Sequence, residues 1–333
     1  MSLRVLMMGT GEFALPAFQA LIDSSHSVVG LVTQPDRTGQ GHHQHANRMK
    51  ELALAHNLPV FQPDNVNTPE SLARLRAFEA DLFVVAAYGQ ILSAGLLGIP
   101  VRGAVNLHGS LLPKYRGAAP IQYAIWKGEQ ESGVTLFQIE PKLDAGPMLG
   151  VVKTPIGSQE TSGQLHDRLA ILAAPLTIQV LDRMEQGTLQ PEFQVGGEVT
   201  KAPRLKKEQG LIDWTLSPKQ LDWHHRAMQP WPMPYTFLHL PGKKPQRILI
   251  LELTPATTWP GSSRQAPALP GEIRVDGTQL CVRTGQDEAG QNAWVQVHRL
   301  QPSGKRGMTA AEFLRGTSLQ EARFGNEQPE TSP

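Results

Sequence analysis

Short apolar runs alternate with amphipathic helical patterns over residues 1–188, as in a sheet whose strands are connected by helices. The pattern predicts strands at Leu3–Met8, Ser27–Thr33, Pro59–Phe61, Leu82–Ala87, Gly103–Leu107, Val134–Ile139 and Met148–Val152. It predicts helices at Pro16–Ser24, Asn47–His56, Pro69–Phe78, Ala119–Trp126 and Thr161–Gln186. We therefore expect an α/β domain with a Rossmann-like, mostly parallel sheet. The last two strands are expected to be antiparallel, because only a short loop joins them.

The pattern changes in the second half of the chain. Residues 189–207 are rich in Pro, Gly and charge, which predicts a linker between domains. After a helix at Ser217–Met228, the sequence predicts short strands at Tyr235–Leu240, Arg247–Leu253, Gly271–Val275, Gln279–Arg283 and Trp294–Leu300. Five short strands separated by turn residues favour a small OB-like β-barrel domain over residues 208–315. Residues 316–333 are expected to form a disordered tail.

Composition limits the class of protein. The chain has 333 residues, of which 40% are apolar and 18% charged, as in ordinary globular proteins with room for two domains. Cys281 is the only cysteine, so an intrachain disulfide and a cysteine-based metal cluster are excluded. We find no signal peptide and no apolar run long enough to cross a bilayer. A cytoplasmic protein without membrane attachment is expected.

The small net charge of +1 hides an asymmetry between the two halves. Residues 1–200 contain 14 Lys and Arg against 18 Asp and Glu, whereas residues 201–315 contain 16 against 9. A polyanion would therefore be attracted to the second half. Ordinary variation of surface charge accounts for the same numbers equally well.

The strongest local pattern is Ala104-Val-Asn-Leu-His-Gly-Ser-Leu-Leu-Pro113, where polar residues follow an apolar strand. Ligands bind at the carboxyl ends of strands in open α/β sheets. Because side chains alternate along a strand, Asn106 and His108 point to the same side. An amide donor beside an imidazole is suited to stabilising an oxyanion. Two surface polar residues at a strand end remain the alternative interpretation.

A second polar position follows the strand that ends at Ile139. The segment Ile139-Glu-Pro-Lys-Leu-Asp-Ala-Gly-Pro147 carries the carboxylate of Asp144 in a turn. Near His108, this carboxylate would favour the protonated imidazole and assist proton transfer. Ordinary turn chemistry accounts for an Asp before Ala-Gly as well. Between the two segments lie Lys114, Tyr115 and Arg116. They either bind a flat anionic substrate or belong to a solvated loop.

Two further patterns are weak. Gly9-Thr-Gly-Glu-Phe-Ala14 after the first strand matches a loose dinucleotide-binding fingerprint, but Asp36, the nearest acidic candidate, follows a proline in a loop. His42, His43 and His45 are close together but are accompanied by no carboxylate or cysteine. This favours a polar loop over a metal site, and no metal is expected.

These residues together resemble the methionyl-tRNA formyltransferase family, from about residue 3 to residue 315. In the first half the resemblance is carried by Thr33-Gln-Pro-Asp-Arg37, Leu58-Pro-Val-Phe-Gln-Pro63, Val85-Ala-Ala-Tyr-Gly89, Asn106-Leu-His-Gly-Ser-Leu-Leu-Pro113, Arg116-Gly-Ala-Ala-Pro-Ile121 and Leu143-Asp-Ala-Gly-Pro147. In the second half it is carried by Ile212-Asp-Trp214, Pro230-Trp-Pro-Met233, Pro270-Gly-Glu-Ile273 and Leu300-Gln-Pro-Ser-Gly-Lys305 with Met308. In the family resemblance, the set of Asn106, His108 and Asp144 is shared by transferases that use 10-formyltetrahydrofolate, and the second-half motifs indicate the tRNA enzyme.

The resemblance implies direct attack of the methionyl amine of initiator methionyl-tRNA on the formyl carbon of 10-formyltetrahydrofolate. It makes Asn106, His108 and Asp144 the catalytic set, with no metal and no covalent enzyme intermediate. Asn106 and His108 would stabilise the oxyanion, and Asp144 would keep His108 charged. The implied folate-binding residues are Ser110, Leu111, Leu112, Pro113, Tyr88, Gly89, Gln90, Ile91, Leu92, Ile139, Glu140 and Leu143.

The sequence departs from the family in two loops. The family's Gly-Thr-Pro-Asp-Phe is replaced by Gly9-Thr-Gly-Glu-Phe13, and the loop after Arg37, which is basic in the family and enters the tRNA acceptor stem, has Gln40 followed by histidines. The expected tRNA-binding cations are Arg37, Arg48, Lys50, Lys206, Lys207, Lys305 and Arg306. We expect a monomer. Two alternatives stay open: a formyltransferase for another amine, such as a sugar nucleotide or a purine precursor, and a nucleic-acid-binding module on an inactive or dinucleotide-binding α/β domain.

Overall fold

The computed structural model describes residues 2–36, 47–256 and 269–326. The chain divides into two compact units. Unit 1 contains residues 1–124, 130–157 and 164–204, and unit 2 contains residues 125–129, 158–163 and 205–333. Arg37 and the three closely spaced histidines lie outside the described residues.

Unit 1 is built on a single sheet in which apolar residues fill the strands. Its strands are β1 (Arg4–Gly9), β2 (Ser27–Val32), β3 (Val60–Phe61), β4 (Leu82–Ala86), β5 (Ala104–His108), β6 (Glu131–Gln138) and β7 (Met148–Pro155). The strand order is β3-β2-β1-β4-β5-β6-β7. The first five strands in this order are parallel, while β6 is antiparallel to both of its neighbours. The Rossmann-like, mostly parallel sheet is therefore confirmed, as is the antiparallel final pair.

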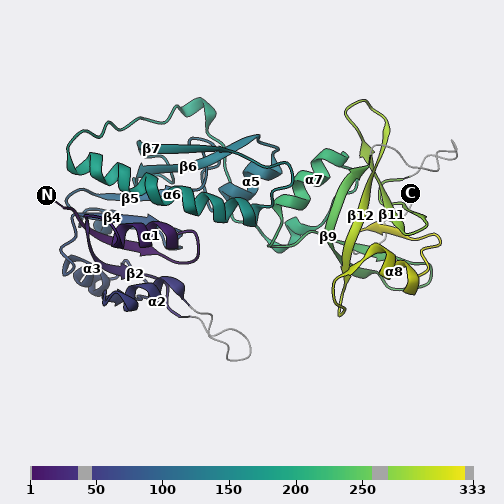
Figure 1. Cartoon of the computed structure of the whole chain (residues 1–333), viewed down its shortest axis with the longest axis horizontal. Coiled ribbons are helices and arrows are strands. Elements are labelled where there is room, and N and C mark those ends of the chain that lie inside the picture. Colours follow the sequence, from purple (N-terminus) through teal and green to yellow (C-terminus); the bar gives the residue numbers. More distant parts are fainter. Residues whose placement is uncertain (1, 37–46, 257–268, 327–333) are drawn as a thin grey trace. The chain divides into compact units, whose positions relative to one another are not determined.

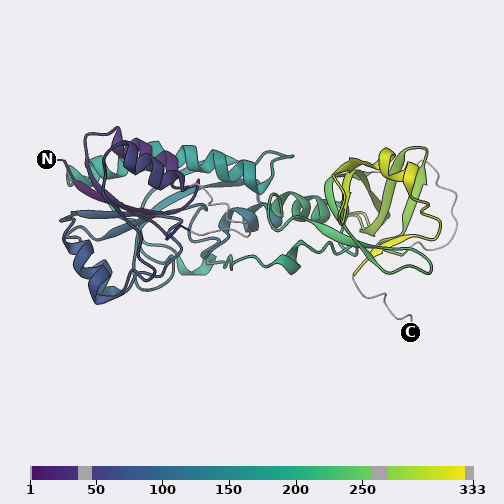
Figure 2. The same ribbon diagram turned by 90° about the horizontal axis from the view of Figure 1, so that it is seen from below.

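Helices cover the sheet of unit 1. They are α1 (Leu15–Ile22), α2 (Arg48–Ala55), α3 (Pro69–Arg76), α4 (Ala94–Leu97), α5 (Pro120–Trp126) and α6 (Ser162–Glu185). Local signals set their starts, because the side chains of Asn47 and Thr68 cap α2 and α3. Figure 2 shows α1 and α6 on one face of the sheet and α3 on the other. Both faces of the central strands are consequently buried.

The segment after α6 follows unit 1 instead of leaving it directly. Glu192 forms a β-bridge with Met148, and Lys201 forms one with Arg116. Between them lies the short 3-10 helix η1 (Gly196–Glu198). We call residues 192–202 the brace segment. The expected linker thus makes backbone contacts with unit 1 at Glu192 and at residues 200–202, and a second 3-10 helix, η2 (Lys207–Gly210), follows in unit 2.

Unit 2 contains a curled sheet in which every strand pair is antiparallel. Its elements are α7 (Pro218–Ala227), β8 (Tyr235–His239), β9 (Gln246–Ala256), β10 (Ile273–Asp276), β11 (Gln279–Gln286), β12 (Asn292–Pro302), β13 (Met308–Thr309), α8 (Ala310–Gly316) and β14 (Arg323–Gly325), labelled in part in Figure 1. The order is β10-β11-β12-β9-β8-β14, and β13 pairs with β12. A bridge between Glu272 and Arg323 links the two ends of this order, so the sheet curls into a half-barrel.

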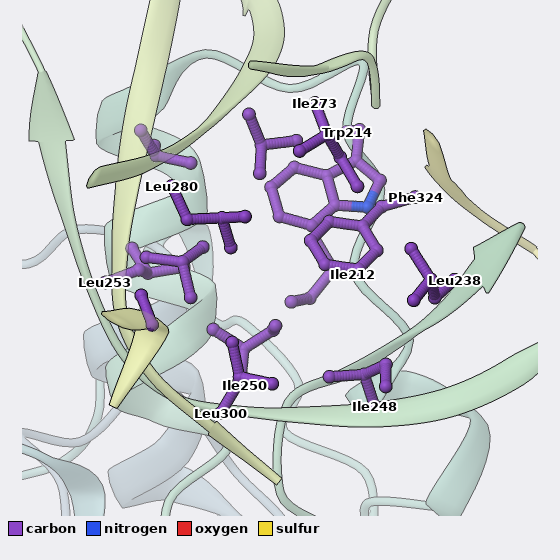
Figure 3. Close-up of a cluster of buried hydrophobic side chains, with 14 of the residues drawn as sticks. Ile212, Trp214, Leu238, Ile248, Ile250, Leu253, Ile273, Leu280, Leu300 and Phe324 are labelled. Carbon is purple, nitrogen blue, oxygen red and sulfur yellow. The ribbon is translucent and has the colours of Figure 1, made fainter. Parts of the chain in front are cut away.

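The core of unit 2 includes a residue from the segment that we expected to be a disordered tail. Phe324 in β14 is 2% exposed, and its ring stacks on Trp214 with centroids 5.6 Å apart (Figure 3). The indole of Trp214 donates a hydrogen bond to Thr236, whose hydroxyl donates to the carbonyl of Gly325. The structure therefore differs from the expected tail up to residue 326, because a buried aromatic ring and a strand pair hold this segment in place.

The helices of both units are too short or too polar to cross a bilayer. Across residues 2–36, 47–256 and 269–326, no helix combines the length and the apolar content needed to span a membrane.

Candidate active site

Strand β5 places two polar side chains at its carboxyl end. Asn106 lies opposite Phe137 of β6, and His108 lies opposite Thr135. The two side chains share one side of the sheet because residues two apart in a strand point the same way. His108 is 5% exposed, whereas Asn106 is partly exposed. Asn106 is paired with β4 on one side and β6 on the other, whereas His108 lies past the end of the β4 pairing and is paired with β6 alone.

The imidazole of His108 lies between two oxygen atoms. Nδ1 is 3.8 Å from Oδ2 of Asp144, and Nε2 is 2.9 Å from the backbone carbonyl oxygen of Tyr115. Because a carbonyl oxygen only accepts hydrogen bonds, Nε2 carries a proton. Nδ1 is then the nitrogen that gains or loses a proton, and it faces the carboxylate. The carboxylate and imidazole from two separate segments therefore converge beyond the strand ends.

Burial decides the charge of this imidazole. Removal from water lowers the pKa of His108, although the negative charge of Asp144 and the hydrogen bond to the Tyr115 carbonyl both act to raise it. The expectation that Asp144 would keep His108 charged is thus opposed by burial, and the net direction of the His108 pKa is downward. The resting imidazole is neutral at pH 7, with Nδ1 ready to accept a proton.

Asp144 is held in an unusual conformation. Its φ is +46°, a left-handed value that is uncommon for residues other than glycine. The backbone N–H of Gly117 donates a 2.7 Å hydrogen bond to Oδ2 of Asp144, whose side chain is 13% exposed. Two residues later, a Cβ at Gly146 would lie 1.9 Å from the carbonyl oxygen of Gln138. Only glycine therefore fits where this loop returns to β6.

The loop after His108 is tied to β6 by Thr135. The hydroxyl of Thr135 donates to the carbonyl of Ser110 and accepts from the N–H of Leu112. The hydroxyl of Ser110 donates to the carbonyl of Lys114. Of the four folate candidates in this loop, the side chains of Ser110, Leu112 and Pro113 are buried, and only Leu111 is partly exposed.

The loop after β4 contains five more folate candidates. Ala87 has a φ of +47°, and Gly89 follows with +84°. The Tyr88 hydroxyl is buried and has no hydrogen-bond partner among the described residues, and burial raises the pKa of Tyr88 to about 12. Leu92 is partly buried, and Ile91 is 89% exposed.

Gln90 has an internal role in the same loop. Its side chain accepts a hydrogen bond from the N–H of Val66 and donates one to the carbonyl of Pro63. It therefore fixes the neighbouring segment.

The three remaining folate candidates follow β6. Ile139 is partly buried, and its N–H donates to the carbonyl of Ala104. Glu140 and Leu143 are exposed, and 68% of Leu143 is accessible. Ile91 and Leu143 are large apolar side chains that are exposed to solvent. Ile91 follows β4, and Leu143 follows β6.

The first turn of the chain is determined by packing. A Cβ at Gly9 would lie 2.9 Å from the Cβ of Ala14 and 3.0 Å from the Ala86 carbonyl oxygen. The hydroxyl of Thr10 contacts that of Thr33 at 3.2 Å and accepts from the N–H of Gln34. The glycine fingerprint thus serves the close approach of α1 to the sheet.

The cations expected to bind tRNA differ in their surroundings. In unit 1, Arg48 forms a 2.7 Å ion pair with Glu12, and Lys50 forms one with Asp36. In unit 2, Lys206, Lys207, Lys305 and Arg306 are all exposed, and Arg306 is 3.9 Å from Glu312. Of the expected tRNA-binding residues, the two that the structure describes in unit 1 are therefore each paired with an acidic side chain.

The sequence pattern did not reveal the role of the brace segment at this site. The Gln194 side chain contacts the Asp144 loop, and the Thr200 hydroxyl accepts a 2.8 Å hydrogen bond from the N–H of Tyr115. Arg116, for which we considered substrate contact or a solvated loop, donates to Gln194. These contacts join residues about 50 to 85 positions apart, which no local spacing indicates.

Side chains that commonly bind metals are scattered over the described part of the chain. Within residues 2–36, 47–256 and 269–326, no three His, Cys, Asp or Glu side chains are grouped so that they could hold a metal ion.

Comparison with known proteins gives a consistent family. A formyl transferase family model matches residues 1–181, and a model of the formyl transferase C-terminal domain matches residues 204–318. Methionyl-tRNA formyltransferase of Methylococcus capsulatus is 41% identical over 324 residues, covering 97% of this chain and 100% of that protein. The enzyme of the same name from Trichlorobacter lovleyi is 41% identical over 317 residues, or 95% of each protein.

Solved structures share the fold at much lower identity. WlaRD, a sugar 3N-formyl transferase, has a TM-score of 0.65 and 15% identity, covering 92% of this chain and 100% of WlaRD. HypX from Aquifex aeolicus, in complex with tetrahydrofolic acid, has a TM-score of 0.57 and 16% identity, covering 94% of this chain and 47% of HypX. At these identities, the likeness concerns the fold alone.

Proposed function

This chain belongs to the formyl transferase family, and from that premise we propose that it transfers the formyl group of 10-formyltetrahydrofolate to the amino group of initiator methionyl-tRNA. Relatives at 41% identity over nearly the full chain carry the name methionyl-tRNA formyltransferase. The product would support translation initiation. The observation that carries the proposal is the convergence of His108 and Asp144, 3.8 Å apart, beside Asn106 at the end of β5.

Asn106 is the proposed oxyanion donor, and His108 can join it only once Nδ1 carries a proton, because its Nε2–H is bonded to the Tyr115 carbonyl. When the methionyl nitrogen forms a bond to the formyl carbon, negative charge develops on the formyl oxygen. The Asn106 amide, fixed on an interior strand, donates a hydrogen bond to that oxygen without reorganising. Collapse then breaks the bond between the formyl carbon and N10 of the carrier.

His108 and Asp144 are the proposed proton-transfer pair. The attacking amine must lose one proton, and N10 of the departing tetrahydrofolate must gain one. The neutral Nδ1 of His108 accepts the proton, and the adjacent carboxylate stabilises the imidazolium that results. The same nitrogen then returns the proton towards N10.

The folate-binding role of the strand-end loops is a proposal that rests on their chemistry. Burial leaves the Tyr88 hydroxyl with no hydrogen-bond partner among the described residues. Ile91 and Leu143 offer exposed apolar surface that suits a flat ring. Because Ser110, Leu112 and Pro113 are buried, we propose that this loop contributes chiefly through its backbone.

The proposed tRNA contact relies on the exposed cations of unit 2. Lys206, Lys207, Lys305 and Arg306 are suited to phosphate groups, whereas Arg48 and Lys50 would first have to exchange their acidic partners. We also propose that the enzyme acts as a monomer in the cytoplasm, with catalysis in unit 1 and tRNA binding in unit 2. A single buried thiol at Cys281 fits a reducing compartment.

The test is a transfer assay with purified protein and 10-formyltetrahydrofolate. Charged initiator methionyl-tRNA should be formylated, and charged elongator methionyl-tRNA and an amino-sugar nucleotide serve as comparison acceptors. Faster transfer to the sugar nucleotide would replace the acceptor in this proposal. Binding of tRNA without any turnover would refute the enzyme itself.

A further inference from the structure

The side chain of Gln194 makes contacts on both of its polar ends. Nε2 donates to the backbone carbonyl of Asp144 at 3.0 Å and to that of Gly146 at 2.8 Å. Oε1 accepts from Nε and Nη2 of Arg116 at 3.1 and 2.6 Å. This glutamine lies in the brace segment, between the two family-model matches that end at residue 181 and begin at residue 204.

The orientation of this amide follows from its partners. A guanidinium only donates hydrogen bonds, so the amide oxygen must face Arg116. The NH2 group must then face the two carbonyl oxygens of the Asp144 loop. Arg116 itself is held by backbone bonds to the brace segment, because its N–H donates to the carbonyl of Thr200 and its carbonyl accepts from Ala202. Gln194 therefore links Arg116 to the Asp144 loop in one fixed orientation of its amide.

The Asp144 loop depends on hydrogen bonds from outside the loop. The left-handed φ of Asp144, +46°, is uncommon for a residue with a Cβ and persists only where surrounding contacts hold it. Residues 139–147 form no helix or strand, so their carbonyl groups lack the partners that regular structure supplies. Two of these carbonyls, at residues 144 and 146, are satisfied by one Gln194 amide.

The brace segment also supports the other side of His108. The hydroxyl of Thr200 accepts from the N–H of Tyr115, and the carbonyl of Tyr115 accepts from Nε2 of His108. Tyr115 has a φ of +62°, so its carbonyl direction also depends on outside contacts. The brace segment thus contacts the backbone that carries each of the two oxygen atoms around the imidazole, while the Asp144 carboxylate itself also accepts from Gly117.

We propose that Gln194 is a positioning residue that sets the distance between the Asp144 carboxylate and His108. The inference rests on the proposed formyl transfer, because it assigns to Gln194 a role in that same site. It predicts that loss of the two donated hydrogen bonds lowers kcat while substrate binding is largely kept.

Two substitutions at position 194 separate the possible roles. Gln194→Ala removes all four hydrogen bonds, whereas Gln194→Glu keeps an acceptor for Arg116 but places a carboxylate against two carbonyl oxygens. We expect kcat to fall by about 10- to 100-fold in both variants, because small displacements at a catalytic group have effects of this order. KM for folate and for tRNA should change by less than about three-fold. The matched control is Phe193→Ala, since Phe193 is the preceding residue and is 78% exposed; it should behave like the wild type.

A double-mutant cycle tests whether Gln194 acts through Asp144. In an Asp144→Asn background, Gln194→Ala should reduce kcat by less than about two-fold further, because coupled residues are non-additive. The kcat–pH profile gives a second readout. Since the Asp144 charge raises the pKa of His108, its displacement should move the inflection to lower pH in Gln194→Ala but not in Phe193→Ala.

The outcomes distinguish this inference from the proposed function. Unchanged kcat in both position-194 variants would overturn it, as would equal effects of Gln194→Ala with and without Asp144→Asn. Normal kcat in Gln194→Glu alone would also overturn it, since Arg116 would then be the only contact that matters. If Gln194→Ala does not fold, the Gln194→Glu comparison decides. Absence of formyl transfer by the wild type would instead refute the proposed function.

Discussion

Phe324 gives the sharpest test of the unit 2 core. The ring is 2% exposed, stacks on Trp214 and belongs to a strand that pairs with β8. Replacement of a buried Phe by Ala lowers the free energy of unfolding by about 3–5 kcal/mol. Unit 2 is intermediate in size, so each kcal/mol shifts its Tm by about 4 °C, and Phe324→Ala should lower that Tm by about 12–20 °C. A chain ending at residue 315 should lose at least as much, because β14 is removed with the ring.

The assay can follow unit 2 alone. All six tryptophans of the chain belong to unit 2, so thermal unfolding monitored by tryptophan fluorescence reports on that unit. A chain ending at Asn326 is the matched control, since it retains β14 and should unfold at the wild-type temperature. If Phe324→Ala and the chain ending at residue 315 both unfolded within about 2 °C of the control, Phe324 would not be part of the core, and the segment from residue 316 onward would be a disordered tail after all.

Three further predictions concern chemistry, tRNA and pH. Asn106→Ala, which removes the oxyanion donor, and His108→Ala, which removes the proton acceptor, should each lower kcat by about 10² or more, and full activity in either would exclude that residue from the mechanism. Lys305→Ala combined with Arg306→Ala should weaken tRNA binding and flatten the dependence of log K on log salt by about 1.5, and an unchanged slope would make this patch ordinary surface. Burial lowers the pKa of His225 to about 4, so between about pH 6.5 and pH 4 the unfolded state binds more protons than the folded state. Unit 2 should therefore lose up to about 3 kcal/mol as the pH falls through this window; His225→Asn should reduce that loss, and an equal loss in both proteins would contradict the assignment.

The elements with strong periodicity could be predicted from sequence. Strands such as β4 and β5 were found within one or two residues, because continuous apolar runs of this length in an α/β chain are typical of strands buried on both faces. Helix α7 was found within one residue at each end, and the structure shows a capping box of Ser217 and Gln220 at its start. Sequence patterns are therefore sufficient where interactions between neighbouring residues determine the element.

The shorter elements were missed for different reasons. Helix α4 has four residues, too few for a periodic signal. Helix α8 did carry a signal, because Thr309 and Glu312 form a capping box that could have been recognised. β14 has three residues, and only a lone Phe324 in a polar segment hinted at burial.

The residues of the candidate site also differ in whether the sequence could predict their role. Asn106 and His108 could be placed by strand alternation, and the proximity of Asp144 followed from the adjacent strand end. The direction of the His108 pKa could not be predicted, because it depends on how completely neighbouring elements exclude water. Gln194 was hidden in a segment without periodicity, because its role depends on partners that are distant along the chain.

The path of the brace segment decides where the chain can be divided. A fragment ending at residue 188 would include Asn106, His108 and Asp144, yet it would lack the amide and the hydroxyl that orient the loops on either side of the imidazole. Such a fragment should fold its sheet and still catalyse poorly. A chimera that exchanges the catalytic half between related enzymes should therefore take the donor chain through Arg204. The donor sheet then keeps its own brace segment.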